Sequence, residues 1–387
     1  MIYDFDAINN RRGGLSYKYN AVENDVLPLW VADMDFKCAP EITSALNEFV
    51  NTGIYGYTSV PDSYYQAYID WFYKRDGILH QKESLICVPG IVPAISATIK
   101  ALTLPGDQVI IQSPVYNCFF SSIRNCGCET VDNELFIKNN CHYEMDLEDL
   151  EQKLSASRAR ILLLCNPQNP SGRLWSFDEL KNLALICKKH HIYVISDEIH
   201  CDVRDENSKF TSMAHFYDLL ENRLVIFKSA SKAFNLAGLQ NACIIARDPF
   251  IRERIDRQVN INEICDVNPF GIIGAITAFN KCESWLIQMN KYVKNNYLFL
   301  KDFFENNPCG IKVFPLESTY LSWLSIKDLN ISSKDFCKKL YKEGRVLLNE
   351  GTEYGKGGEG FIRLNLALPK TVLNEALIRI LKTAKSI

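Results

Sequence analysis

Residues 160–172 read RILLLCNPQNPSG, an apolar run that changes abruptly into a loop of asparagine, proline, serine and glycine. Short apolar runs bounded by turn residues in this way are typical of strands buried inside a sheet. Amphipathic stretches lie between several such runs, for example at residues 93–104 and 177–190. Strands alternating with helices predict an α/β fold with a mostly parallel sheet covered on both faces. The other apolar runs of this kind lie at residues 85–88, 108–112, 192–196, 223–227 and 242–246.

The pattern changes after about residue 280. A long helical run at 285–305 is followed by short strands near 320–324 and 361–368 and by a final helix. This order predicts a second, smaller α+β domain. We therefore expect an N-terminal arm at 1–45 that packs with the small domain, a large domain at 46–284 and the small domain at 285–387.

Composition restricts the functional classes. The chain has 387 residues, of which 47% are hydrophobic and 23% charged, and its net charge of −3 gives no reason to expect a nucleic-acid partner. Its fourteen cysteines are spread along a long chain, and the closest pair, Cys126 and Cys128, has no further ligand at zinc spacing. We expect no metal site, no membrane span and no signal peptide, and hence a cytoplasmic protein with reduced thiols.

Polar residues follow five of the expected strands, where the carboxyl ends of parallel strands meet loops and helix N-termini. They occur at Gly90–Val92, Tyr116, Asn166–Gly172, Asp197–His200 and Lys228–Lys232. A glycine turn at a helix N-terminus suits a phosphate, an acid can keep a pyridine nitrogen protonated, and a lysine can form a Schiff base. Each feature alone has an ordinary structural explanation, but together they indicate pyridoxal phosphate (PLP).

The strings NPQNPSG (166–172), SDEIH (196–200) and SASKAFNLAGL (229–239) resemble the PLP-binding motifs of the aminotransferase superfamily of fold type I. More narrowly, the chain is similar to the cystathionine β-lyase-like, or C–S lyase, branch of that superfamily. The supporting strings are WVADMDF (30–36), YGY (55–57), STYLSW (318–323) and GFIRLN (360–365), together with His200 where many aminotransferases have tyrosine. The similarity covers nearly the whole chain.

The resemblance implies a role for each matching residue. Lys232 would form the Schiff base, Asp197 would pair with the pyridine nitrogen, and Tyr116 would stack on the ring, so these three are the expected catalytic residues. Asn169 would bind the phenolic oxygen of the cofactor and lie beside the substrate, and Arg363 would bind the substrate α-carboxylate through its planar fork. The phosphate and the rest of the cofactor would contact Gly90, Ile91, Val92, His200, Ser229, Ser231 and, from a partner subunit, Tyr57.

Three local details refine this interpretation. Arg363 and Asn365 share one face of their expected strand, an alternation that an edge-strand arginine facing water would satisfy equally well. Gln240 stands eight residues after Lys232, where many aminotransferases have a phosphate-binding arginine, which weakens the transaminase interpretation. The glycines at 355, 357 and 360 match G-x-G-x-x-G but precede a strand, so we expect a turn and not a dinucleotide site.

The resemblance implies a homodimeric PLP enzyme that performs α,β-elimination on a sulfur-substituted L-amino acid and releases a thiol, pyruvate and ammonia. Two alternatives stay open from the residues themselves. An aminotransferase would use the same side chains, and a non-catalytic regulatory protein could retain the fold. The sequence pattern identifies neither the exact sulfur substrate nor any regulatory partner.

Overall fold

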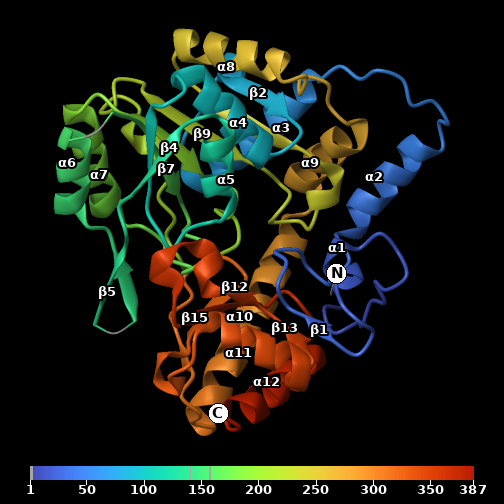
Figure 1. The fold of residues 1–387 in the computed structure, drawn as a ribbon. Helices are drawn as coiled ribbons and strands as arrows, with labels where there is room; N and C mark the ends of the chain where they lie inside the picture. The colour runs from blue at the N-terminus through green and yellow to red at the C-terminus, as the bar shows by residue number, and fades with distance from the viewer. Residues whose placement is uncertain (1–2, 140, 157) are drawn as a thin grey trace.

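The computed structural model describes residues 3–139, 141–156 and 158–387, and a seven-stranded sheet forms its centre (Figure 1). The strand β10 is antiparallel to both of its neighbours, and the other adjacent pairs are parallel. The expected α/β class with a mostly parallel sheet is therefore confirmed. In spatial order the strands are β2 (Leu85–Val88), β10 (Ala242–Ala246), β9 (Leu224–Lys228), β8 (Tyr193–Asp197), β7 (Ala159–Cys165), β3 (Gln108–Ile111) and β4 (Glu129–Asp132).

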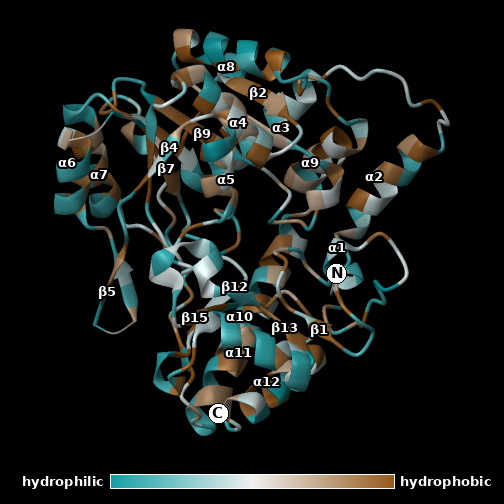
Figure 2. Cartoon of the chain, viewed as in Figure 1, coloured by the Kyte–Doolittle hydropathy of each residue, from teal (hydrophilic) through white to brown (hydrophobic). Residues whose placement is uncertain are grey.

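The sheet separates two hydrophobic clusters. Ile161 and Leu163 of β7 belong to one cluster, whereas Leu162 and Leu164 belong to the other, because successive side chains of a strand point to opposite faces. Figure 2 shows apolar residues along the strands of the large sheet and a mixture of polar and apolar residues along outer helices such as α6 and α8. One face packs against α4 (Ile91–Leu102), α5 (Cys118–Asn125) and α8 (Pro249–Ile261), and the other against α3 (Asp62–Asp76), α7 (Phe177–Lys189) and α9 (Pro269–Lys281).

Two helix starts show how local sequence directs the chain. The helix α7 begins with the predicted capping box, in which Ser176 and Glu179 each accept a backbone N–H of the other residue. The helix α4 begins at Ile91 with Gly90 as its N-cap, which confirms the expected glycine turn at a helix N-terminus, two residues before the amphipathic stretch at 93–104. The backbone amides of Ile91 and Val92 therefore belong to the first turn of α4, where no intrahelical acceptor exists for them.

The C-terminal part contains a four-stranded antiparallel sheet that lies below the large sheet in Figure 1 and is coloured orange to red. Its strand β15 (Phe361–Asn365) lies between two neighbours, so Arg363 is not on an edge strand and its side chain is buried. The remaining strands of this sheet are β11 (Lys312–Val313), β12 (Leu321–Ser325) and β14 (Asn349–Glu350). The helices of this part are α10 (Glu283–Asn306), α11 (Ser333–Lys339) and α12 (Lys370–Ala384).

The N-terminal segment reaches the same region. Its strand β1 (Leu27–Pro28) pairs in parallel with β13 (Val346–Leu347), so this arm contacts the C-terminal part, while the domain boundaries themselves stay a prediction. Within the described residues, no helix is long and apolar enough to cross a membrane. The other elements are α1 (Tyr17–Asn20), α2 (Pro40–Val50), α6 (Leu147–Ala156) and the hairpin of β5 (Phe136–Lys138) and β6 (His142–Glu144).

Candidate active site

A cavity of about 480 Å³ lies where the carboxyl ends of the central strands face the C-terminal sheet. Most of the residues predicted for the site line this cavity, although they come from positions up to 273 residues apart. Of the described residues, Ser229 and Tyr57 are the two predicted members that do not line it. The predicted residues that line the cavity are Gly90, Ile91, Val92, Tyr116, Asn169, Asp197, His200, Ser231, Lys232 and Arg363.

One end of the cavity is suited to a phosphate. The first turn of α4 opens onto it through Gly90, Ile91 and Val92, and no side chain caps that turn. Free backbone amides and the helix dipole at such a turn attract an anion. Ser231 and Gln240 also line the cavity, whereas the Ser229 hydroxyl donates to the Asn241 carbonyl at 2.6 Å. Ser229 also accepts the Ser231 amide at 3.0 Å, so it braces the turn that presents Ser231.

Asp197 places a carboxylate deep in the cavity. It ends β8, in register with Cys165 of β7 and Phe227 of β9, and only 3% of its surface is exposed. One of its oxygens accepts the Ile199 amide at 3.2 Å. Burial raises the pKa of Asp197 to about 7, against the opposing effects of the Ile199 amide and Lys232. A buried acid of this kind favours a ligand that carries a protonated nitrogen.

This pKa predicts how the stability of the cofactor-free protein depends on pH. Because the folded pKa of Asp197 is above the unfolded value, folding holds the proton more tightly, and this group destabilises the fold increasingly as pH rises from about 4 to about 7. Asp197→Asn removes the titration. Its stability relative to the unmodified chain should increase by about 2–3 kcal/mol between pH 5 and pH 8.

Urea unfolding of the cofactor-free chains at both pH values measures this difference. An exposed carboxylate variant, Asp218→Asn, is the control and should show no such increase, since the Asp218 side chain is 88% exposed. A pH-independent difference for Asp197→Asn would contradict the proposed burial effect.

Lys232 supplies an amine in the same cavity. It lies in the turn after β9, and its Nζ donates to the Ala32 carbonyl at 2.7 Å. Burial, reinforced by the Arg363 charge, lowers the pKa of Lys232 to about 8. About a tenth of this lysine is therefore uncharged at pH 7, far more than for an ordinary lysine, and the uncharged amine is the form that attacks a carbonyl carbon or accepts a proton.

Arg363 also lines the cavity and is held by three hydrogen bonds. Its Nη1 donates to Asn169 Oδ1 at 3.0 Å, and its Nη2 donates to the Trp30 carbonyl and to Asn349 Oδ1 at 2.9 Å each. Its Nε is buried and has no hydrogen-bond partner in the described part of the chain. A buried donor without an acceptor is costly, so this guanidinium is suited to receive an anionic group such as a carboxylate.

His200 and Tyr116 complete the polar lining. The His200 ring packs edge-on against Tyr320 with centroids 6.1 Å apart, and burial followed by the charges of Lys232 and Arg363 lowers its pKa, so the ring is neutral. Its Nδ1 is a second buried polar atom without a partner among the described residues. Burial and then Cys118 raise the pKa of Tyr116, which keeps its hydroxyl protonated.

Sequence reasoning assigned no role to several residues of this site. The Ala32 carbonyl accepts from Lys232, and the Tyr320 hydroxyl also donates to it at 3.0 Å. Ala32 belongs to the string WVADMDF and Tyr320 to the string STYLSW, and the resemblance of these strings to the family was the only sequence signal for either residue. Asn349 comes from the two-residue strand β14, whose sequence carries no recognisable pattern. Tyr17, Trp30, Glu353 and Tyr354 are further lining residues that were not predicted.

The donor set fits pyridoxal phosphate. The uncapped turn of α4 and Ser231 would hold its phosphate, Asp197 its ring nitrogen, Asn169 its phenolic oxygen and Lys232 its aldehyde carbon. The unpartnered Nε of Arg363 remains for the carboxylate of an amino acid. Among the described residues, no group of three or more His, Cys, Asp or Glu is arranged to hold a metal ion.

Comparison with known proteins places this chain in a family. The model of the family described as aminotransferase class I and II matches residues 24–380. Cystathionine beta-lyase PatB of Bacillus subtilis is 36% identical over 97% of this chain and 98% of its own length. The crystal structure of cystalysin from Treponema denticola, which contains a pyridoxal 5'-phosphate cofactor, has a TM-score of 0.96 at 33% identity and covers all of both chains.

A PLP-bound C–S lyase from Staphylococcus hominis, complexed with the inhibitor L-cycloserine, has a TM-score of 0.92 at 29% identity. This similarity covers 99% of the present chain and 98% of the other. The chain therefore belongs to the aminotransferase class I and II family of PLP-dependent enzymes, and its full-length relatives include cystathionine beta-lyases and C–S lyases.

Proposed function

We propose that this chain is a PLP-dependent C–S β-lyase that cleaves the Cβ–S bond of a sulfur-substituted L-amino acid such as cystathionine or cysteine. The observation that carries the proposal is one cavity lined by Lys232, whose pKa is lowered to about 8, by the buried acid Asp197 and by Arg363 with an open donor. The names of the full-length relatives, cystathionine beta-lyase and C–S lyase, supply the reaction type.

The side chains divide the work as follows. Arg363 binds the α-carboxylate and orients the Cα–H bond, and the neutral Nζ of Lys232 removes the α-proton. Asp197 keeps the proton on the ring nitrogen, and Tyr116 covers the ring. When bound, pyridoxal phosphate supplies an electron-accepting ring for the charge that develops at Cα. The thiolate then leaves Cβ, and hydrolysis of the released aminoacrylate by water gives pyruvate and ammonia.

An aminotransferase is the second candidate, because it requires the same residues and differs only in where the proton from Cα is returned. Gln240, a neutral residue in the cavity wall, favours the lyase. A non-catalytic regulatory protein is the third, and the presence of Lys232, Asp197 and Asn169 in the lining of one cavity argues against it. A site that poorly controls whether the proton is returned or the thiolate leaves Cβ would show both aminotransferase and lyase activity.

A product assay distinguishes the candidates. With L-cystathionine and the PLP-loaded chain, we expect pyruvate, ammonia and free thiol in equal amounts. A parallel reaction with an L-amino acid and a 2-oxoacid should give much slower exchange of the amino group. Faster exchange than thiol release would reject the lyase in favour of the aminotransferase, and a purified chain that stays colourless with added PLP would support the non-catalytic alternative.

The homodimer and the cytoplasmic location belong to the same proposal. Ile54, Tyr55 and Tyr57 form an exposed apolar group in one loop, and Tyr57 is fully exposed, as expected for a surface that a second copy covers. The partner subunit's Tyr57 would then reach the phosphate end of the cavity. The fourteen cysteines, all of which are free thiols in the structure, suit a reducing compartment.

Tyr57→Phe is expected to weaken PLP binding by about ten-fold, because it removes one hydrogen bond to a charged phosphate. Absorbance titration of the cofactor-free chain with PLP measures the dissociation constant, and sedimentation should give twice the mass of the chain for both forms. Tyr73→Phe, another exposed tyrosine, is the control. A monomer in sedimentation, or unchanged PLP affinity, would contradict the shared site.

A further inference from the structure

The backbone of residues 30–36, here called the strap, holds the two basic residues of the cavity. The Trp30 carbonyl accepts from Arg363 at 2.9 Å, and the Ala32 carbonyl accepts from Lys232 at 2.7 Å. Asn365 Nδ2 donates to the carbonyls on either side of Ala32, those of Val31 and Asp33, at 2.6 Å each. The position of the Ala32 oxygen, and hence of the Lys232 amine, is therefore fixed from both sides.

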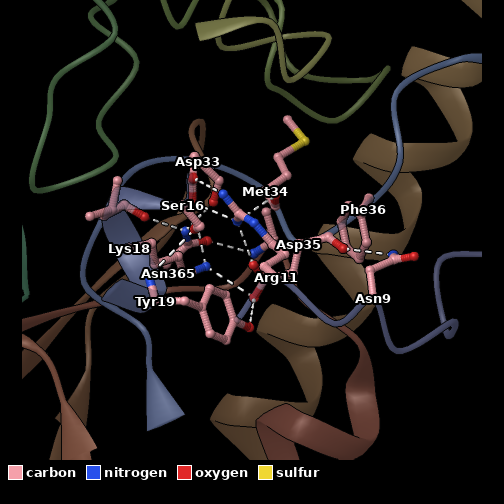
Figure 3. A network of polar contacts seen from close by, with 12 residues as sticks. Asn9, Arg11, Ser16, Lys18, Tyr19, Asp33, Met34, Asp35, Phe36 and Asn365 are labelled. Atoms are coloured by element: carbon pink, nitrogen blue, oxygen red, sulfur yellow. Dashed lines mark hydrogen bonds and ion pairs between the residues drawn. The ribbon is translucent and has the colours of Figure 1, made fainter. Parts of the chain in front are cut away.

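The acidic side chains of the strap contact residues nearer the start of the N-terminal arm (Figure 3). Arg11 forms ion pairs with Asp33 at 2.5 Å and with Asp35 at 2.8 Å. Lys18 contacts the same two carboxylates at 3.6 and 3.0 Å, and its side chain is completely buried. These four residues, here called the clamp, bring together two positive and two negative charges.

The clamp is attached to the arm at further points. Ser16 caps the short helix that carries Lys18, the Tyr19 hydroxyl donates to Asp35 at 3.1 Å, and Trp30 Nε1 donates to the Lys18 carbonyl at 3.2 Å. Desolvation makes a buried ion cluster a weak contributor to stability, and apolar residues of similar size often replace one without loss. A role in fixing geometry and charge near the cavity accounts better for a fully buried lysine at this place.

We propose that Arg11 and Lys18 are positioning residues for Lys232: by pairing with Asp33 and Asp35 they hold the Ala32 carbonyl against the amine and compensate the Asp33 charge beside it. This proposal rests on the proposed function only in that Lys232 is the group that accepts the proton. The clamp residues themselves touch neither substrate nor cofactor in this arrangement.

The electrostatic part of the proposal has a definite sign. The charged and titratable groups facing Lys232 are Arg363, Asp33, Asp197, Cys118 and His200. Burial and Arg363 lower the pKa of Lys232, whereas Asp33, Asp197 and Cys118 raise it. Because Arg11 and Lys18 neutralise Asp33, loss of a clamp cation should strengthen the Asp33 effect, and loss of the Asp33 charge should remove it.

Two variants test the proposal because their expected shifts have opposite signs. Lys18→Met should raise the pKa of Lys232 by about one unit, and Asp33→Asn should lower it by a similar amount. The pKa is measured on the full-length cofactor-free chain from the pH dependence of reductive methylation at Lys232, followed by mass spectrometry. At pH 7, labelling of Lys232 in Lys18→Met should be about ten-fold slower than in the unmodified chain.

Arg345→Met is the matched control. Arg345 also joins the arm to the C-terminal part, through Asp25 at 2.6 Å and Glu23 at 3.1 Å, but these pairs lie far more exposed and contact no residue of the strap. Its loss should leave the Lys232 pKa unchanged. In the PLP-loaded chain, the acidic limb of the plot of kcat against pH should shift in the same direction as the Lys232 pKa measured by methylation, for each variant.

Several outcomes would overturn the proposal. A purely structural clamp would loosen the arm and admit water in both variants, so both would raise the Lys232 pKa. Unchanged labelling in both would show that the clamp and Lys232 are independent. If Lys18→Met does not fold, Asp33→Asn alone distinguishes the two roles of the clamp. Its Lys232 pKa falls if the clamp acts electrostatically and rises if the clamp is purely structural. The labelling assay does not depend on which reaction the enzyme performs, so failure of the lyase assignment would be recognised separately.

Discussion

Lys232→Ala is expected to reduce lyase turnover by at least about 10³-fold and to remove the visible absorbance of the lysine-linked cofactor, because the variant has neither the amine that links the cofactor nor the base that takes the α-proton. The pKa of Lys232, lowered to about 8 by burial and Arg363, makes this amine the suited proton acceptor in the cavity. Pyruvate formation from L-cystathionine and the absorbance spectrum of the PLP-loaded protein measure the two losses.

Lys74→Ala is the matched control for this experiment. The Lys74 side chain is 60% exposed and forms one surface ion pair with Glu283, so its removal should change neither stability nor turnover by a measurable amount. The variant Lys232→Ala should also unfold at a similar urea concentration in the absence of cofactor, since an alanine replaces a desolvated amine. Normal turnover by Lys232→Ala would reject the assignment of Lys232 and with it the proposed mechanism.

The central sheet could be predicted because its strands are buried on both faces. Such strands read as continuous apolar runs, and the run at 85–88 coincides with β2. The strand β4 escaped prediction because it lies at the sheet edge and its sequence, ETVD, contains a single apolar residue and so no apolar run. The glycine turn after the run at 85–88 correctly predicted the start of α4, whereas the amphipathic spacing is recognisable only from residue 93.

The site was predictable to the extent that polar residues directly follow strands. The topology of the sheet alone brings Asn169 from the loop after β7, Asp197 from the end of β8 and Lys232 from the turn after β9 to one cavity. The position of Arg363 depends on the packing of a second sheet, and the contacts of Ala32 depend on the path of the N-terminal arm. Neither arrangement leaves a periodic pattern in the sequence, so the resemblance was the only guide to both segments.

Arg363→Lys is expected to lower kcat/KM for the sulfur amino acid by about 10²–10³-fold, although the positive charge is kept. The planar guanidinium has five N–H donors in a fixed fork, and three of them are occupied by Asn169, Trp30 and Asn349. Two donors remain for the substrate, one on Nε and one on Nη1. A lysine ammonium has three donors in all, so it must abandon either these acceptors or the carboxylate. Losing a charge-assisted contact of this kind costs about 2–4 kcal/mol.

The assignment to the α-carboxylate is tested by comparing an S-substituted cysteine with its analogue that lacks the carboxylate. The unmodified chain should strongly prefer the amino acid. In Arg363→Lys, the ratio of kcat/KM for the amino acid to kcat/KM for the analogue should fall by nearly the same factor as kcat/KM for the amino acid itself, because the analogue has no carboxylate to contact Arg363. Arg173→Lys is the control, because Arg173 is similarly buried and paired with Glu179 and Glu317 but lies outside the cavity. If Arg363→Lys slowed both substrates equally, Arg363 would be acting through Asn169 or the strap, and the carboxylate would have to be bound elsewhere.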